Sequence, residues 1–186
     1  MEGKIVIVSG PSGVGKDTVI DAWIAQNPRV QRVITCTSRQ PRDGEVNGVH
    51  YHFFTPEEMQ AKEAAGDFYE MKNVHGNFYA TPKKGVQDIL DAGGIAVLRI
   101  DTQGAIELMP KMPHAVTVFI DPPSFEELER RIRSRALDSE EVIQTRLKNA
   151  RNEIACSLRY RHIVTNDVVE HAVRKLEYII APKVTA

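Results

Sequence analysis

The chain has 186 residues, of which 42% are hydrophobic and 26% are charged, and these values fit a single soluble globular domain with a sizeable core. Its formal net charge of −1 excludes the overall positive charge that draws many proteins to nucleic acid or to an anionic membrane. The sequence has neither an apolar run of about 18 residues nor a signal peptide, so we expect no membrane partner. Cys36 and Cys156 lie far apart, without the spacing of a metal site or a disulfide framework, which favours a reducing, cytoplasmic setting.

A phosphate-binding motif opens the chain. Residues 5–8 are β-branched and predict a buried strand, and Gly10, Gly13, Gly15 and Lys16 follow at once. This order of strand, glycine loop and helix is typical of the phosphate-binding loop G-x-x-x-x-G-K-[ST], in which backbone N–H groups and the start of the helix bind phosphate oxygens. The residue after the lysine should be a Ser or Thr that holds Mg²⁺, and here it is an aspartate. The alternative is a glycine-rich turn that binds nothing.

The next elements are separated by Pro, Gly and polar residues. We expect a helix from residue 17 or 18 to 25, and Pro28 prevents its continuation. A short strand at 30–35, a polar loop at 36–48 and a strand at 49–54 follow.

The middle of the chain predicts a helix and a small antiparallel patch. Thr55 and Glu58 have the spacing of a capping box for a helix at 56–65. Two strands at 68–74 and 77–80 are close enough in sequence to pair through a short turn.

From residue 82 onward helices and strands alternate, and Ser124 with Glu127 has the spacing of a second capping box. The expected helices cover residues 82–92, 105–111, 124–134, 139–157 and 167–180, and the expected strands cover 95–100, 115–120 and 162–164. Strands separated by helices predict an α/β fold with a parallel sheet flanked by helices on both faces. Residues 33–81 interrupt this alternation and predict an inserted lobe.

Two arginines predict a second anion site. Arg39 and Arg42 flank a proline in the polar loop, and arginine offers a rigid fork of donors for phosphate oxygens. Tyr51 follows the loop, and Tyr79 would lie across the lobe. A solvated arginine loop explains the same spacing.

Two carboxylates are candidates for recognition of a base. Glu70 falls in an expected strand and could accept hydrogen bonds from the N–H edge of guanine or cytosine, although a charge at a strand end is the simpler interpretation. Asp101 follows a core strand, where ligands gather in open parallel sheets, and a helix N-cap explains it equally well.

A cationic run lies at the end of the expected helix 124–134 and just beyond it. It contains Arg130, Arg131, Arg133 and Arg135, and Arg146 on the next helix could converge on the same anion. Such a lid would supply positive charge where negative charge develops during phosphoryl transfer. A solvated cationic face paired with nearby glutamates is the alternative. His50 and His52 share a strand face, but the absence of further ligands near them in sequence argues against a metal site.

The sequence strongly resembles the guanylate kinase family over nearly its whole length. Residues 9–16 (Ser-Gly-Pro-Ser-Gly-Val-Gly-Lys) look like the phosphate loop of that family, and residues 37–53 look like its GMP-binding segment. Residues 75–81, 100–105 and 146–147 are also similar. The resemblance implies a P-loop kinase core with an inserted GMP-binding lobe and a helical lid. Its expected divisions are a core of 1–32, 82–125 and 160–186, a lobe of 33–81 and a lid of about 126–159.

By this resemblance the protein is an enzyme that transfers phosphate from ATP to GMP, and to dGMP, with Mg²⁺ accompanying ATP. Residues implied in ATP binding are Gly10, Pro11, Ser12, Gly13, Val14, Gly15, Lys16, Asp17, Thr18, Arg135 and Asn166. Residues implied in GMP binding are Thr35, Arg39, Arg42, Tyr51, Glu70, Tyr79, Thr81 and Asp101. Lys16, Arg39, Arg131 and Arg146 are the implied catalytic residues. We expect no nucleic-acid or membrane partner and a monomer or small homo-oligomer.

Two departures from the family pattern bear on the metal. Asp17 replaces a Ser or Thr, and Arg99 replaces an acid two residues before Asp101. One hypothesis is that Asp17 holds Mg²⁺ in place of both groups, since a carboxylate is a good Mg²⁺ ligand. The other is an ion pair between Asp17 and Arg99 that leaves the metal to phosphates and water.

Two other functions stay open from the sequence. A lysine-aspartate loop is also found in ribose 1,5-bisphosphate phosphokinases, although these lack the full GMP segment. Non-catalytic guanylate-kinase-like modules of scaffold proteins are more distant, because they lack a working phosphate loop.

Overall fold

The computed structural model describes residues 2–74, 76–134 and 139–181. The strands are β1 (Lys4–Ser9), β2 (Val30–Arg32), β3 (Cys36–Thr37), β4 (His52–Phe53), β5 (Phe68–Val74), β6 (Asn77–Pro82), β7 (Ile95–Arg99), β8 (Val116–Asp121) and β9 (His162–Thr165). The helices are α1 (Lys16–Gln26), α2 (Pro56–Ala64), α3 (Lys83–Asp91), α4 (Thr102–Leu108), α5 (Phe125–Ser134), α6 (Glu140–Ala155) and α7 (Val169–Ile180), with 3-10 turns at Met109–Lys111 and Ser157–Arg159.

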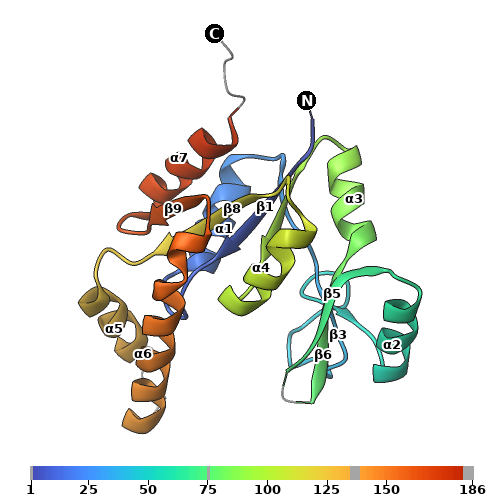
Figure 1. The fold of residues 1–186 in the computed structure, drawn as a ribbon, viewed down its shortest axis with the longest axis horizontal. Coiled ribbons are helices and arrows are strands. Elements are labelled where there is room, and N and C mark those ends of the chain that lie inside the picture. Colours follow the sequence, from blue (N-terminus) through green and yellow to red (C-terminus); the bar gives the residue numbers. More distant parts are fainter. Residues whose placement is uncertain (1, 75, 135–138, 182–186) are drawn as a thin grey trace.

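A five-stranded sheet of order β2-β7-β1-β8-β9 forms the centre of the molecule (Figure 1). All of its neighbouring strands pair in parallel, as the alternation of strands and helices predicts. Because side chains alternate along a strand, β1 buries Val6 and Val8 on one face and Ile7 on the other. Helices α1, α5, α6 and α7 cover the first face, and α3 and α4 cover the second. The prediction of helices on both faces is therefore confirmed.

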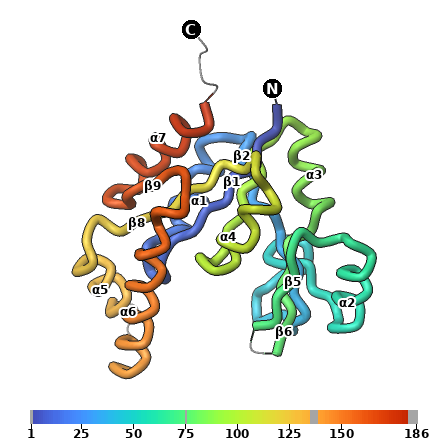
Figure 2. Tube along the Cα trace, viewed as in Figure 1, coloured from blue at the N-terminus to red at the C-terminus, as the bar shows by residue number. Residues whose placement is uncertain are grey.

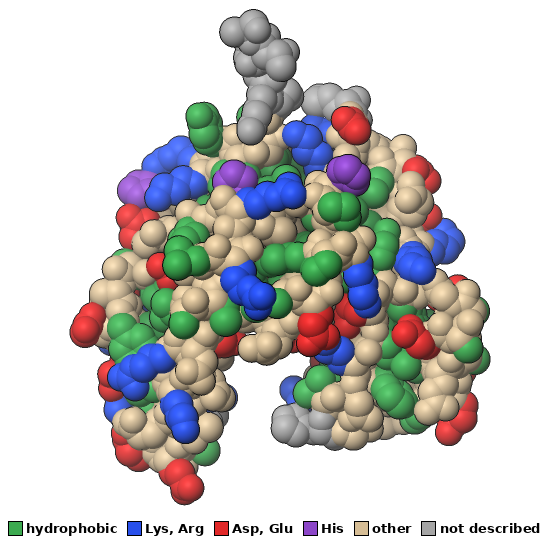
Figure 3. Space-filling model, viewed as in Figure 1, with side chains coloured by type: hydrophobic (Ala, Val, Ile, Leu, Met, Phe, Trp, Pro, Cys, Tyr) green, Lys and Arg blue, Asp and Glu red, His purple; other side chains and the backbone are tan. Residues whose placement is uncertain are grey.

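A second, four-stranded sheet of order β4-β3-β6-β5 lies beside the first (Figure 2). β5 and β6 pair antiparallel, as expected, and β3 pairs with β4 in parallel. Met59 of α2 and Phe68 of β5 are buried in a small separate core under this sheet. Figure 3 shows a hollow between this part of the molecule and the arm formed by α5 and α6.

Three short strands differ from the sequence expectations. Residues 36 and 37 form β3 inside the expected loop, because they pair antiparallel with β6. The expected strand at 49–54 contracts to β4, since Gly48 turns the chain with a φ of 78°. The strand at 30–35 ends at Arg32, and Thr35 O already accepts a hydrogen bond from His52 N in the second sheet.

The helix ends follow their capping residues. The capping box of Thr55 and Glu58 is present in both directions. The expected box at Ser124 is different: Glu127 N donates to Ser124 Oγ, but the Glu127 carboxylate accepts from two arginines of its own helix. The expected helix 105–111 begins earlier, because Asp101 caps α4. Over the described residues, no helix combines the length and apolar character needed to cross a membrane.

Candidate functional site

The glycine loop after β1 has the backbone geometry of an anion cradle. Gly10, Gly13 and Gly15 have φ angles of 148°, 86° and 90°, which other residues rarely adopt. A Cβ on Gly10 would lie 2.2 Å from Ile120 O, and one on Gly15 would lie 2.7 Å from Asn166 Nδ2. The glycines therefore serve both the turn and close packing against β8 and the chain after β9. Lys16 begins α1 directly after the loop.

Lys16 lies inside this cradle and close to a carboxylate. Its Nζ donates to Gly10 O over 2.6 Å and to Pro11 O over 3.0 Å. Burial lowers the pKa of Lys16, and the negative charge of Glu153 opposes that shift. Glu153 belongs to α6, and its Oε2 accepts from Ser12 N over 3.3 Å. The charges on the loop and on α6 are thus coupled.

Two side chains from other elements donate hydrogen bonds to the backbone of the glycine loop. The buried Asn166 donates from Nδ2 to Val14 O over 2.8 Å. Arg131 of α5 donates from Nη1 to the same Val14 oxygen over 3.1 Å and from Nη2 to Asn166 O over 3.1 Å. Its Nε donates to Glu127 over 2.8 Å. Arg131 therefore links the arm to the glycine loop.

The arginine loop is organised around Glu45. Arg39 donates from both terminal nitrogens to Glu45, over 2.9 Å each, and Arg42 N donates to the same carboxylate over 2.7 Å. These bonds lower the pKa of Glu45 to about 2 and raise that of Arg39. The Arg39 guanidinium also lies 5.6 Å from the centre of the Tyr51 ring. Tyr51 in turn packs edge-on against Tyr79, so the expected anion-site residues are neighbours.

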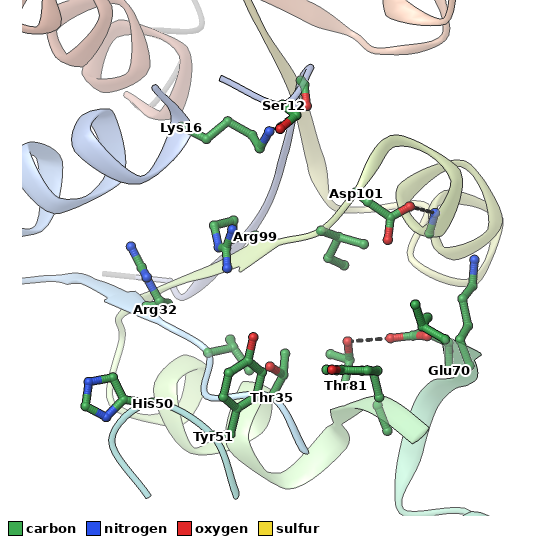
Figure 4. Close-up of a pocket in the computed structure, with 18 of the residues that line it drawn as sticks. Ser12, Lys16, Arg32, Thr35, His50, Tyr51, Glu70, Thr81, Arg99 and Asp101 are labelled. Atoms are coloured by element: carbon green, nitrogen blue, oxygen red, sulfur yellow. Dashed lines mark hydrogen bonds between the residues drawn. The ribbon is translucent and has the colours of Figure 1, made fainter. Parts of the chain in front are cut away.

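The carboxylates of Glu70 and Asp101 face one cavity (Figure 4). Glu70 pairs with Thr81 across β5 and β6, and Thr81 Oγ1 donates to Glu70 Oε1 over 2.7 Å. Burial raises the pKa of Glu70, and this hydrogen bond opposes the shift. Asp101 Oδ1 accepts from Gly104 N over 2.8 Å as the N-cap of α4, so its second oxygen is the one available to a ligand. The cap interpretation of Asp101 is correct and is compatible with binding.

This cavity of about 610 Å³ joins the two sheets and is large enough for a nucleotide. Of the expected site residues, it is lined by Gly10, Ser12, Lys16, Thr35, Tyr51, Glu70, Tyr79, Thr81 and Asp101. Among the described residues that line it, Arg39, Arg42, Arg131 and Arg146 do not occur. The expected base-reading residues therefore line the cavity together with part of the glycine loop, whereas these four arginines do not line it.

Asp17 is engaged by two arginines. Arg99 Nε lies 3.1 Å from Asp17 Oδ1, and Arg99 Nη1 donates to Oδ2 over 3.4 Å. Arg32 Nη1 lies 3.5 Å from the same Oδ1. Thr18, the next residue of α1, is exposed. Of the two hypotheses for Asp17, the contact required by the ion pair is present.

The arginines on α5 make two kinds of contact: some pair with glutamates on the surface, and one reaches the glycine loop. Arg130 pairs with Glu127, and Arg133 pairs with Glu129 and Glu140, which is the solvated, paired face proposed as the alternative. Arg131 is the member that reaches the loop. Arg135 lies outside the described residues. Arg146 is half-buried on α6, and no group of three potential metal ligands occurs in the described parts of the chain, around the two histidines or elsewhere.

The sequence analysis did not identify Arg32 and Glu153 as cavity residues, although the position of each in its element indicated this. Arg32 is the last residue of β2, and the carboxyl ends of parallel strands share an edge. Glu153 follows Arg146 by seven residues, which places both on one face of α6. A search of all strand ends and of that helix face would have found both.

Comparison with known proteins agrees with this geometry. The family model described as guanylate kinase matches residues 2–183. The guanylate kinase of Clostridium perfringens (strain 13 / Type A) is 44% identical over 96% of this chain and 82% of its own length. That of Xanthomonas oryzae pv. oryzae (strain MAFF 311018) is 42% identical over 95% of this chain and 87% of its own. The crystal structure of guanylate kinase from Anaplasma phagocytophilum has a TM-score of 0.72 at 34% identity, over 96% of this chain and 84% of that one. The chain belongs to the guanylate kinase family.

Proposed function

We propose that this protein transfers the γ-phosphoryl group of ATP to a phosphate oxygen of GMP, and of dGMP, giving ADP and a nucleoside diphosphate. The acceptor oxygen forms a bond to the γ-phosphorus while the bond from that phosphorus to the β,γ-bridging oxygen breaks, and ADP leaves with the electron pair. The acceptor phosphate is already anionic, so no strong general base is needed. Catalysis then consists of positioning and of charge neutralisation.

The observation that carries this proposal is the separation of charge along the cavity. Lys16 and the glycine loop lie at one end, Glu70 with Thr81 lies at the other, and Asp101 lies between them (Figure 4). Phosphates are attracted to the cationic end, and a base that presents N–H donors fits the carboxylate end. Guanine presents such donors on its N1 and N2, which adenine does not.

The remaining expected residues are assigned to the phosphates of the two nucleotides and to the adenine. We assign the acceptor phosphate to Arg39, Arg42, Tyr51 and Tyr79, which contact one another directly or through Glu45. Arg131 and Arg146 are assigned to the transferring phosphates, and Asn166 and Arg135 to the adenine side. In this proposal the lobe is 33–81 and the lid is about 126–159. Closure of the two would exclude water and limit wasteful hydrolysis of ATP.

Mg²⁺ is the proposed companion of ATP, and the test of its fit is the donor chemistry near Lys16. Mg²⁺ prefers oxygen ligands and needs only one or two carboxylates besides phosphates and water. Asp17 supplies a half-exposed carboxylate on the first turn of α1. Its oxygens already contact Arg32 and Arg99 but keep further lone pairs, and Asp17 is not among the described residues that line the cavity, so Asp17 would hold the ion through a water. When bound, the ion neutralises charge on the β- and γ-phosphates.

The function is tested by a coupled kinase assay with separate acceptors: GMP, dGMP, AMP, UMP and ribose 1,5-bisphosphate, each with a Mg²⁺ titration. The proposal expects GMP to have the highest kcat/KM. Preference for the sugar phosphate identifies a different phosphokinase. Failure of ATP–Mg²⁺ to bind in calorimetry identifies a non-catalytic module.

The role of Asp17 is tested by Asp17→Ser. If Asp17 holds the metal, the Mg²⁺ concentration that gives half-maximal activity changes, and the binding of Mg²⁺–ADP measured by calorimetry changes with it. Activity and Mg²⁺ dependence that both survive intact overturn this assignment.

A further inference from the structure

Three charged residues meet at the carboxyl edge of the central sheet. Arg32 ends β2 and Arg99 ends β7; because these strands pair in parallel, with Arg32 opposite Val97, both side chains emerge at the same edge. Asp17 approaches from the first turn of α1 and lies 3.1 Å from Arg99 and 3.5 Å from Arg32. Asp21, one turn further along α1, accepts from Arg32 over 2.8 Å. Two acids of α1 thus hold two arginines of the sheet.

Arg32 and Arg99 line the cavity, whereas Asp17, which contacts both of them, does not. Arg32 and Arg99 line the cavity between Lys16 and Tyr51 (Figure 4). Asp17 is not among the described residues that line it. A guanidinium group has five N–H donors, which is more than the contacts to Asp17 use. Arg99 can therefore keep its contact with Asp17 and still donate to an anion in the cavity.

The position of Arg99 suits a phosphate rather than a base. Arg99 and Lys16 both line the cavity, and Glu70 with Thr81 lies at the end of it away from Lys16 (Figure 4). The positive charge of Arg99 also contributes to the lowered pKa of Lys16, so the two cations that line the cavity repel each other. Two cations held close together lose their mutual repulsion when an anion lies between them.

We propose that Arg99 is a catalytic residue that contacts the phosphoryl group as it passes from the glycine loop to the acceptor, and that Asp17 is its positioning residue. Asp17 fixes the guanidinium in the orientation that presents its remaining N–H donors to the cavity. Arg32 stabilises Asp17 in that position. This inference rests on the proposed function, because it requires a phosphate acceptor on the lobe side of the cavity.

The test compares Arg99→Gln, Arg99→Lys and a matched control, Arg174→Gln, which removes one positive charge from an exposed position on α7. Each variant is assayed for kcat, for KM with GMP and with ATP, and for the affinity of GMP by calorimetry. Arg99→Gln should lower kcat about 10- to 100-fold, the effect of losing a hydrogen bond to a charged group. KM for GMP should change less than kcat, because the contact develops during transfer. Arg99→Lys should recover part of kcat, and Arg174→Gln should equal the wild type.

Asp17→Asn completes a double-mutant cycle. The cycle is measured at saturating Mg²⁺, so that a loss of the metal contact proposed for Asp17 does not contribute to it. If Asp17 acts through Arg99, Asp17→Asn lowers kcat in the wild-type background and has little further effect in the Arg99→Gln background. Additive losses assign Asp17 a role independent of Arg99 and overturn the positioning part.

The outcomes separate this inference from the function on which it rests. A wild-type protein that does not phosphorylate GMP refutes the proposed function. A wild-type protein that does, together with an Arg99→Gln variant of unchanged kcat, overturns the role of Arg99 alone. Thermal unfolding of both Arg99 variants identifies a structural role: a drop in Tm with kcat retained also contradicts the proposal.

Discussion

Replacing Glu70 by Gln is expected to remove most of the preference for a guanine base. Thr81 Oγ1 donates to Glu70 Oε1 over 2.7 Å, which leaves Oε2 to accept from the base. In the variant, the amide oxygen keeps the Thr81 bond and an NH₂ group replaces Oε2. A charged hydrogen bond worth about 1.5–3 kcal/mol is lost, and two donors then face each other at a further cost of about 1–3 kcal/mol.

The combined loss is about 2.5–6 kcal/mol in kcat/KM for GMP, a factor of about 10² to 10⁴. The assay is steady-state kinetics with GMP and with IMP, which keeps the N1–H donor and lacks the N2 amino group.

The wild type should prefer GMP strongly over IMP, and Glu70→Gln should narrow the gap between them. Glu170→Gln, at an exposed position on α7, is the matched control and should match the wild type. A Glu70→Gln enzyme whose kcat/KM for GMP falls less than about threefold would refute the assignment of Glu70 to the base.

Three further predictions concern the supports of the site. Gly15→Ala should lower the free energy of unfolding by about 2–3 kcal/mol, because a left-handed backbone is strained and the new Cβ would lie 2.7 Å from Asn166 Nδ2; a urea titration with an unchanged midpoint contradicts this. Cys36 is buried and burial raises its pKa to about 11, so iodoacetamide at about pH 8 should modify Cys156 first, and equal rates by mass spectrometry would be inconsistent with the fold. The Glu45 pKa of about 2 is depressed, so its ion pair is present above the unfolded pKa and is lost only as the pH falls toward about 2; a ¹³C NMR titration that finds Glu45 half-protonated above about pH 4 argues against the pair.

The central sheet was predictable because its signals are long and redundant. Apolar strands such as 95–100 are bounded by Gly94 and Asp101, and the helices between them leave few alternatives to a parallel sheet. The second sheet was harder, since β3 and β4 have two residues each and cannot show a period. β3 pairs with β6 and β4 pairs with β3, and no local pattern encodes these tertiary contacts.

The site was predictable where a motif fixes the backbone, and less so where partners come from distant elements. The glycine loop follows from its spacing alone. Glu153 contacts Ser12 because α6 packs beside the glycine loop, and Asp17 contacts Arg32 because α1 packs beside β2. Tertiary packing sets both placements. The Asp17–Arg99 contact was foreseen as one of two hypotheses because both residues depart from the family pattern.

The central claim is that this cavity selects GMP as the acceptor of phosphate from ATP. The most direct measurement is a competition in which equimolar GMP, AMP, UMP and ribose 1,5-bisphosphate share one reaction with γ-labelled ATP and Mg²⁺, and the labelled products are separated. The account predicts that the label appears almost entirely in GDP. Label found mainly in another product, or released only as inorganic phosphate, would contradict it.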